Sequence, residues 1–125
     1  IGGFIVKMKS VVIRTRDIKK SIDFYETVLG FTFDTQISAA PGKQIAFLTD
    51  PASCGKLELL YNEQGKETPQ GGLSLTFEVD QIGETEKYLL SKNVRIVSSP
   101  KTIKGGKKIM TALDPNGVEL DFIEE

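Results

Sequence analysis

Two acidic side chains lie within segments that are otherwise apolar. Glu58 is flanked by leucines, and Asp121 lies between Leu120 and Phe122. A carboxylate in apolar surroundings can serve as a general base or as a metal ligand. In an alternating strand the same residue can instead face solvent, and alternation alone does not choose between these readings. Glu58 and Asp121 are therefore the candidate catalytic or metal-binding residues.

Several other kinds of catalytic chemistry have no residues to support them. The chain has no histidine, and its one cysteine, Cys54, has only Lys56 nearby in sequence as a cation that could activate it. No Gly-rich phosphate loop, Ser-His-Asp set or CxxC pair is present. A single cysteine excludes an internal disulfide and suits a reducing compartment. We expect Cys54 to be an ordinary cysteine and the protein to be cytoplasmic.

Length and charge narrow the class further. The 125 residues suit one domain, and 16 basic against 17 acidic side chains give a net charge of −1. A nucleic-acid partner would usually require a basic excess. No apolar run approaches the roughly 20 residues needed to cross a bilayer. We expect neither a nucleic-acid nor a membrane partner, and we treat residues 1–7 as an N-terminal extension of a domain spanning 8–125.

An internal repeat organises the elements that must position the two acids. Asp-Pro occurs at 50–51 and at 114–115, 64 positions apart (114 − 50). A Gly and a strand-like run follow each pair. This recurrence predicts repeat one at 8–62, a polar linker at 63–72 and repeat two at 73–125.

Local signals predict one helix and four strands in each repeat. In the first, Asp17 is a helix N-cap and Gly30 follows the apolar stripe of the helix. In the second, the predicted helix covers 82–92 and ends at Asn93. The predicted strands are 9–15, 31–36, 44–49 and 56–61, then 74–79, a broken strand at 94–97 and 100–103, 108–112 and 118–123.

Two motifs carry a family resemblance. Residues 16–31 contain S-I-x-F-Y followed by L-G-F, and residues 113–122 contain D-P-x-G-x-x-x-D. Over about residues 8–125 the chain resembles the glyoxalase/bleomycin resistance/dioxygenase (vicinal oxygen chelate, VOC) superfamily. The resemblance implies an α+β fold in which two βαβββ repeats form a curled, incomplete-barrel sheet around a cup.

The resemblance also assigns four positions that face into the cup. They are Ser10 and Glu58 from the first repeat, and Ser74 and Asp121 from the second. Metal-dependent members of the superfamily usually place histidine where the two serines stand here. A serine hydroxyl is a poor ligand for Zn²⁺, Ni²⁺ or Fe²⁺. Two carboxylates and two hydroxyls would suit Mg²⁺ or Mn²⁺, if any metal.

Three functions follow as expectations. The first is a homodimeric protein that binds a small organic molecule in the cup with no cofactor, using Phe47 and Phe77 as pocket aromatics and the two acids as counter-charges for a cationic ligand. The alternative is a metal-dependent glyoxalase-like lyase or isomerase in which Glu58 and Asp121 are catalytic and hold Mg²⁺ or Mn²⁺. The third is a partner-binding domain with a closed cup.

Overall fold

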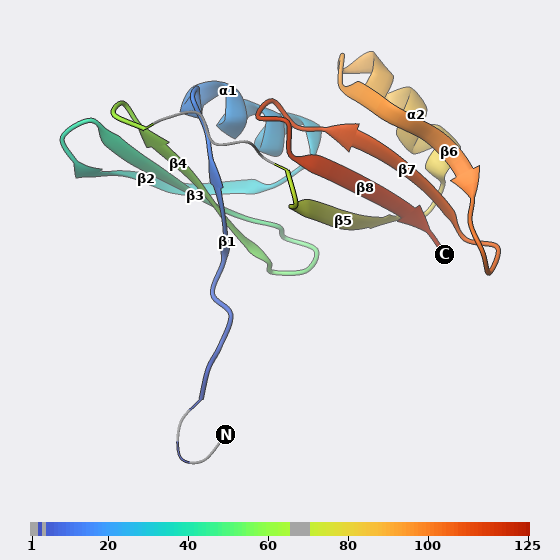
Figure 1. Ribbon diagram of the computed structural model, residues 1–125, viewed down its shortest axis with the longest axis horizontal. Coiled ribbons are helices and arrows are strands. Elements are labelled where there is room, and N and C mark those ends of the chain that lie inside the picture. Colours follow the sequence, from blue (N-terminus) through green and yellow to red (C-terminus); the bar gives the residue numbers. More distant parts are fainter. Residues whose placement is uncertain (1–2, 4, 66–70) are drawn as a thin grey trace. The chain divides into compact units, whose positions relative to one another are not determined.

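The computed structural model describes residues 3, 5–65 and 71–125. The chain divides into two compact units, 1–66 and 67–125, coloured blue to green and yellow to red in Figure 1. The division falls within the predicted linker 63–72, of which 66–70 lie outside the described residues. Within the described part of the chain, no helix is long and apolar enough to cross a membrane.

The first unit is a four-stranded sheet with one helical segment. Its strands run in the order β1-β4-β3-β2, with β1 parallel to β4 and the other neighbours antiparallel. The helical segment packs on β3 and β4. In chain order the elements are β1 Val11–Arg14, α1 Ile18–Asp23, a π-helical turn Phe24–Val28, β2 Thr32–Ala40, β3 Lys43–Thr49 and β4 Lys56–Asn62.

The second unit repeats this plan. Its strands run in the order β5-β8-β7-β6, again with one parallel pair, β5 and β8. Helix α2 packs on β6, β7 and β8. The elements are β5 Ser74–Val79, α2 Ile82–Ser91, β6 Arg95–Thr102, β7 Lys108–Leu113 and β8 Glu119–Glu124. The predicted α+β class and the two βαβββ repeats are confirmed.

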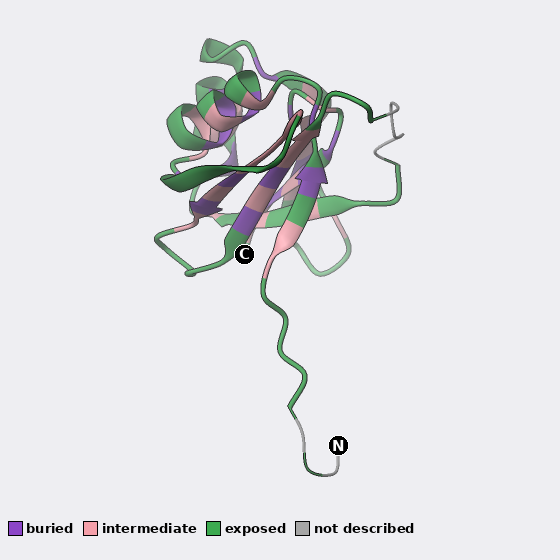
Figure 2. Cartoon of the chain, turned by 90° about the vertical axis from the view of Figure 1, so that its left-hand side faces the viewer, coloured by how far each residue is buried: buried purple, intermediate pink, exposed green. Residues whose placement is uncertain are grey.

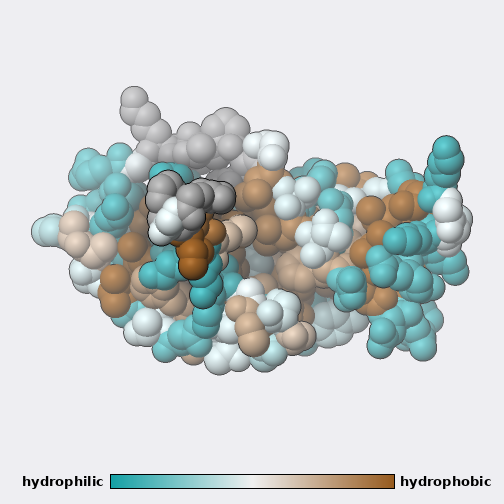
Figure 3. Space-filling model, turned by 90° about the horizontal axis from the view of Figure 1, so that it is seen from below, coloured by the Kyte–Doolittle hydropathy of each residue, from teal (hydrophilic) through white to brown (hydrophobic). Residues whose placement is uncertain are grey.

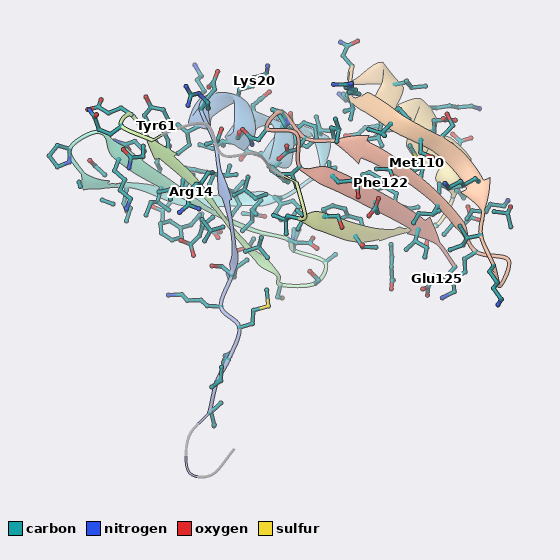
Figure 4. The ribbon with its side chains drawn as sticks, in the orientation of Figure 1. Arg14, Lys20, Tyr61, Met110, Phe122 and Glu125 are labelled. Carbon is teal, nitrogen blue, oxygen red and sulfur yellow. The ribbon has the colours of Figure 1, made fainter. Side chains whose placement is uncertain are left out.

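Alternating side chains build a separate core in each unit. In the first, Ile13, Leu57 and Leu59 are buried while their strand neighbours are half-buried or exposed. In the second, Met110 on β7 pairs with Phe122 on β8, and both are buried (Figure 4). Buried bands alternate along the strands in Figure 2. Burying one such side chain contributes about 1.5–3 kcal/mol, so each sheet has one face fixed by its core and one face free for other uses.

The first helix differs from its prediction in one respect. It begins as expected, with Asp17 Oδ1 accepting from Lys20 N at 3.0 Å. From Phe24 it continues as a π-helical turn, in which Leu29 N donates to Phe24 O at 3.3 Å. The wider turn accompanies the burial of two adjacent aromatic residues, Phe24 and Tyr25. Apolar spacing alone gave no signal for this turn.

The broken strand predicted at 94–97 and 100–103 is a single strand, β6, in the structure. Its pairing with β7 shifts register between Ile96 and Ser98 and again between Ser98 and Lys101. Pro100 falls within the second shift. Proline is tolerated there because β6 is an edge strand, where a missing amide donor costs no central ladder bond.

The two Asp-Pro turns differ in length by one residue. Asp50 N donates to Gly55 O at 2.8 Å, and Asp114 N donates to Val118 O at 3.0 Å. The first closure spans five positions (55 − 50) and the second spans four (118 − 114). The extra residue explains why the repeat offset is 64 at the aspartates and 63 between Glu58 and Asp121 (121 − 58).

Candidate functional site

The free face of the first sheet, opposite the helix, carries Glu58 at its centre. Glu58 on β4 is paired with Val12 on β1 and with Phe47 on β3, so these three side chains point to the same side. Glu58 and Phe47 are half-buried, and Val12 is 45% exposed. The carboxylate therefore lies between two apolar neighbours on a face that the core does not use.

Ser10 fixes the orientation of that carboxylate. Its Oγ donates a hydrogen bond to Glu58 Oε2 at 2.5 Å. Within the described chain Glu58 has no ion-pair partner, so its second carboxylate oxygen retains its acceptor capacity. The resemblance predicted that these two residues would face the same cup, and the structure brings them into contact.

A hollow of about 720 Å³ lies over this face. Its volume falls within the roughly 300–1,000 Å³ typical of small-molecule sites. In the view from below in Figure 3, the surface is a mixture of brown apolar residues and teal polar ones. The lining comes from the segment before β1, from β2 to β4 and from the first Asp-Pro turn: Lys7, Met8, Lys9, Ser10, Asp34, Phe47, Leu48, Cys54, Lys56, Leu57 and Glu58.

A polar chain crosses the same face beside Glu58. Lys56 Nζ donates to Thr49 Oγ1 at 2.8 Å, and Thr49 Oγ1 donates to Asp34 Oδ2 at 2.5 Å. Sequence reasoning did not single out these three residues for the site. A signal was available, because Lys56 lies two positions from Glu58, and Thr49 lies two positions from Phe47, which places each pair on one face.

The second unit arranges its acid differently. Asp121 is half-buried and accepts a hydrogen bond at 2.7 Å from Thr111 Oγ1, its partner across β7 and β8. Ser74 is exposed and lies two positions before Thr76, which pairs with Asp121. Ser74 and Asp121 therefore share a face, but no hydrogen bond joins them.

Phe77 lies on the other face of this sheet. It pairs with the buried Phe122, and the two rings stack with centroids 5.5 Å apart. The half-buried Phe77 thus lies on the core-facing side of its sheet and not beside Asp121, whereas Phe47 does lie beside Glu58. Strand alternation predicts that Phe77 and Ser74 face opposite sides of the sheet, because they are three positions apart.

Comparison with known proteins places the chain in a family. The model of the Glyoxalase/Bleomycin resistance protein/Dioxygenase superfamily matches residues 7–122. The chain belongs to this superfamily. The predicted resemblance is confirmed.

Two relatives found by sequence and one solved structure agree with this assignment. The lactoylglutathione lyase of Haemophilus influenzae is 29% identical over 121 residues, covering 90% of this chain and 88% of that protein. The mitochondrial methylmalonyl-CoA epimerase of Dictyostelium discoideum is 29% identical over 132 residues, covering 95% and 78%. The crystal structure of a superfamily member from Sphaerobacter thermophilus aligns with a TM-score of 0.78 and 26% identity over 97% of this chain and 98% of that one.

The donor set of the chain can be compared with the needs of a transition metal. The chain has no histidine, and the described residues include no group of three or more His, Cys, Asp or Glu placed to hold a metal ion. Each candidate acid already accepts from a hydroxyl of its own unit. A tightly bound transition metal needs three or four nitrogen, sulfur or carboxylate ligands, so the described residues of neither unit fit one.

Proposed function

We propose that this superfamily member binds a small organic molecule in the hollow of its first unit, without a tightly held transition metal. The observation that carries the proposal is the carboxylate of Glu58, held by the Ser10 hydroxyl and lying beside Phe47 in the lining of that hollow. Apolar walls with a few oriented polar groups are what ligand sites require. The walls supply contact area, and Glu58 selects a ligand that donates a hydrogen bond or carries a positive charge.

The proposal includes a homodimer, as the resemblance implies. Val12 and Ile37 are each 45% exposed, and both lie on the free face of the first sheet. They stand on the two edge strands of that sheet, β1 and β2, so a second copy could cover one of them at either edge. Sedimentation equilibrium tests this part: a mass of twice 13.7 kDa supports it, and a monomer at all concentrations contradicts it.

A second candidate function is a lyase or isomerase. The names of two relatives, a lactoylglutathione lyase and a methylmalonyl-CoA epimerase, favour it. A half-buried carboxylate such as Glu58 could accept a proton from a carbon acid bound against Phe47. Because the donor set does not fit a transition metal, this candidate depends on an oxygen-liganded ion such as Mg²⁺ or Mn²⁺, for which carboxylates are suitable ligands.

The deciding experiment combines metal analysis with thermal unfolding. Purified wild-type protein, Glu58→Gln and Asp121→Asn are scanned against Mg²⁺, Mn²⁺, Ni²⁺, Zn²⁺ and Co²⁺. A ligand present at one hundred times its Kd stabilises the folded state by about 2.7 kcal/mol, which is several degrees in Tm. We expect no stoichiometric metal and no such shift. A stoichiometric metal that both variants lose would contradict the metal-free proposal and favour the lyase or isomerase.

A fragment screen by amide NMR tests the binding site itself. We expect the strongest shifts at the amides of Phe47, Lys56 and Glu58, with binding weakened in Glu58→Gln and retained in Asp121→Asn. Shifts confined to the second unit would overturn the assignment of the site to the first.

A further inference from the structure

Two opposite charges stand side by side on the free face of the first sheet. Lys56 and Glu58 are two residues apart on β4, so both side chains point to the side that bears the hollow. At a rise of about 3.3 Å per residue, their attachment points are roughly 7 Å apart. This spacing is short enough for one small molecule to reach both.

Each of the two charges is held toward a different neighbouring strand. The ammonium of Lys56 donates to Thr49 on β3 at 2.8 Å, whereas the carboxylate of Glu58 accepts from Ser10, at the β1 side of β4. Among the described residues, Lys56 and Glu58 form no ion pair with each other or with any third group. The ammonium keeps two further protons to donate, and the carboxylate keeps its second oxygen.

The charges around the hollow disfavour a ligand with one sign of charge. Lys7, Lys9 and Lys56 oppose Asp34 and Glu58, a net charge of +1 (3 − 2). A simple cation attracted by Glu58 would be repelled by three lysines, and a simple anion attracted by Lys56 would be repelled by Glu58 and Asp34. A dipolar molecule avoids both penalties when its ends are correctly placed.

An apolar surface lies beside the two charges. Phe47 is the cross-strand partner of Glu58, and it stands two residues from Thr49, the partner of Lys56. Its half-buried ring can therefore contact the stem of a ligand whose ends reach the two charges.

We infer that the ligand of this hollow is a zwitterion, with a cationic nitrogen bound by Glu58 and a carboxylate or similar anionic group bound by Lys56 across the face of Phe47. The inference rests on the proposed function and specifies its ligand class.

A series of six-carbon probes tests the inference with the intact protein. The probes are 6-aminohexanoate, whose charges lie roughly 7 Å apart when it is extended, together with hexylamine, hexanoate and neutral hexanamide. Each is titrated in amide NMR spectra. We expect 6-aminohexanoate to bind at least about tenfold more tightly than any other member, with shifts centred on Phe47, Lys56 and Glu58.

Three variants assign the two ends of the ligand. Glu58→Gln should bring 6-aminohexanoate down to the affinity of hexanoate, and Lys56→Gln should bring it down to that of hexylamine. Lys101→Gln, an exposed lysine of the second unit, is the matched control and should change nothing.

The outcomes separate this inference from the proposed function. Equal binding of all four probes at the hollow, or a preference for hexylamine or hexanoate, would overturn the zwitterion and leave the proposed site standing. If none of the four shifts the amides of the hollow, the zwitterion is overturned, and the fragment screen then decides whether the proposed site falls with it.

Discussion

Glu58 and Asp121 occupy equivalent positions in the two units, yet their hydrogen bonds come from different strands. Asp121 accepts from Thr111, directly across the strand pair. The equivalent cross-strand residue in the first unit is Phe47, which has no donor, and Glu58 bonds instead to Ser10 on its other side. Replacing a hydroxyl by a ring thus leaves the first unit with an apolar wall beside its acid, whereas the second unit has a satisfied polar pair.

Removing the Ser10 hydroxyl should weaken ligand binding. In Ser10→Ala the Glu58 carboxylate loses its orienting donor, a loss of about 1 kcal/mol that corresponds to roughly fivefold in Kd for 6-aminohexanoate. Amide NMR titration measures it. Ser74→Ala removes the equivalent hydroxyl of the second unit, which has no hydrogen bond to Asp121, and should leave Kd unchanged. Equal effects of the two substitutions would show that Ser10 does not act through Glu58.

The start of α2 should depend on an acid from the last strand. The N-cap residue Gln81 makes no side-chain capping bond, and Glu124 Oε2 accepts from Ile82 N at 2.7 Å in its place. Glu124→Ala should therefore lower the free energy of unfolding by about 1 kcal/mol, measured by urea denaturation. Glu125→Ala loses only an exposed ion pair to Lys107 and should cost less than about 0.5 kcal/mol. A larger loss for Glu125→Ala would contradict the capping role.

The two Asp-Pro turns should differ in their sensitivity to loss of the aspartate. Asp114 is 5% exposed, and its Oδ1 accepts from Asn116 N at 2.7 Å and from Val118 N at 2.8 Å. Asp114→Ala leaves buried amides without an acceptor and should cost about 2–3 kcal/mol. Asp50→Ala should cost about 1 kcal/mol, because the more exposed Asp50 accepts one backbone bond, from Ala52 N at 3.1 Å. Thermal unfolding of both variants checks the order, and a reversed order would refute it.

Replacing Cys54 by glycine should stabilise the protein. It adopts a φ of +66°, in the left-handed region that a side chain disfavours. Cys54→Gly removes that conflict, partly offset by the greater unfolded-state entropy of glycine, and should stabilise the protein by about 0.5–1 kcal/mol. Asn93, with a φ of +60°, is the control, because asparagine tolerates this region and Asn93→Gly should gain less. Urea denaturation distinguishes them, and a destabilised Cys54→Gly would show that the side chain contributes more than the strain it causes.

Local signals in the sequence were sufficient to predict most of the helices and strands. Strand β5 was predicted with its observed bounds, and Asp17 was placed correctly as the cap of α1. The π-helical turn after Asp23 was missed, because a spacing of apolar residues does not report a change in hydrogen-bond pattern. The continuity of β6 was missed because Pro100 looks like a break unless the strand is known to lie at an edge.

The direction of a side chain could be predicted from its own strand, whereas a contact between two strands could not be predicted without their register. Glu58 and Asp121 were found through the resemblance, and alternation along each strand keeps each on the free face of its sheet. The bond from Lys56 to Thr49 needs the register of β3 against β4, which no single segment encodes. Phe77 was assigned to the pocket as an aromatic strand residue, although it lies an odd number of positions from Ser74 and so faces the core side of its sheet.

The extra residue in the first Asp-Pro turn shows that the turn can change in length without shifting the register of β4. A slip of one residue inside β4 would turn Glu58 toward the helix and Leu57 or Leu59 toward the hollow. The turn instead takes up the added length, and the pairing of Phe47 with Glu58 is kept. Both turns close through a left-handed residue, Cys54 in the first and Gly117 in the second. Insertions and deletions between residues 51 and 55 should therefore leave the pairing of Phe47 with Glu58 in place and change only the part of the lining that Cys54 supplies.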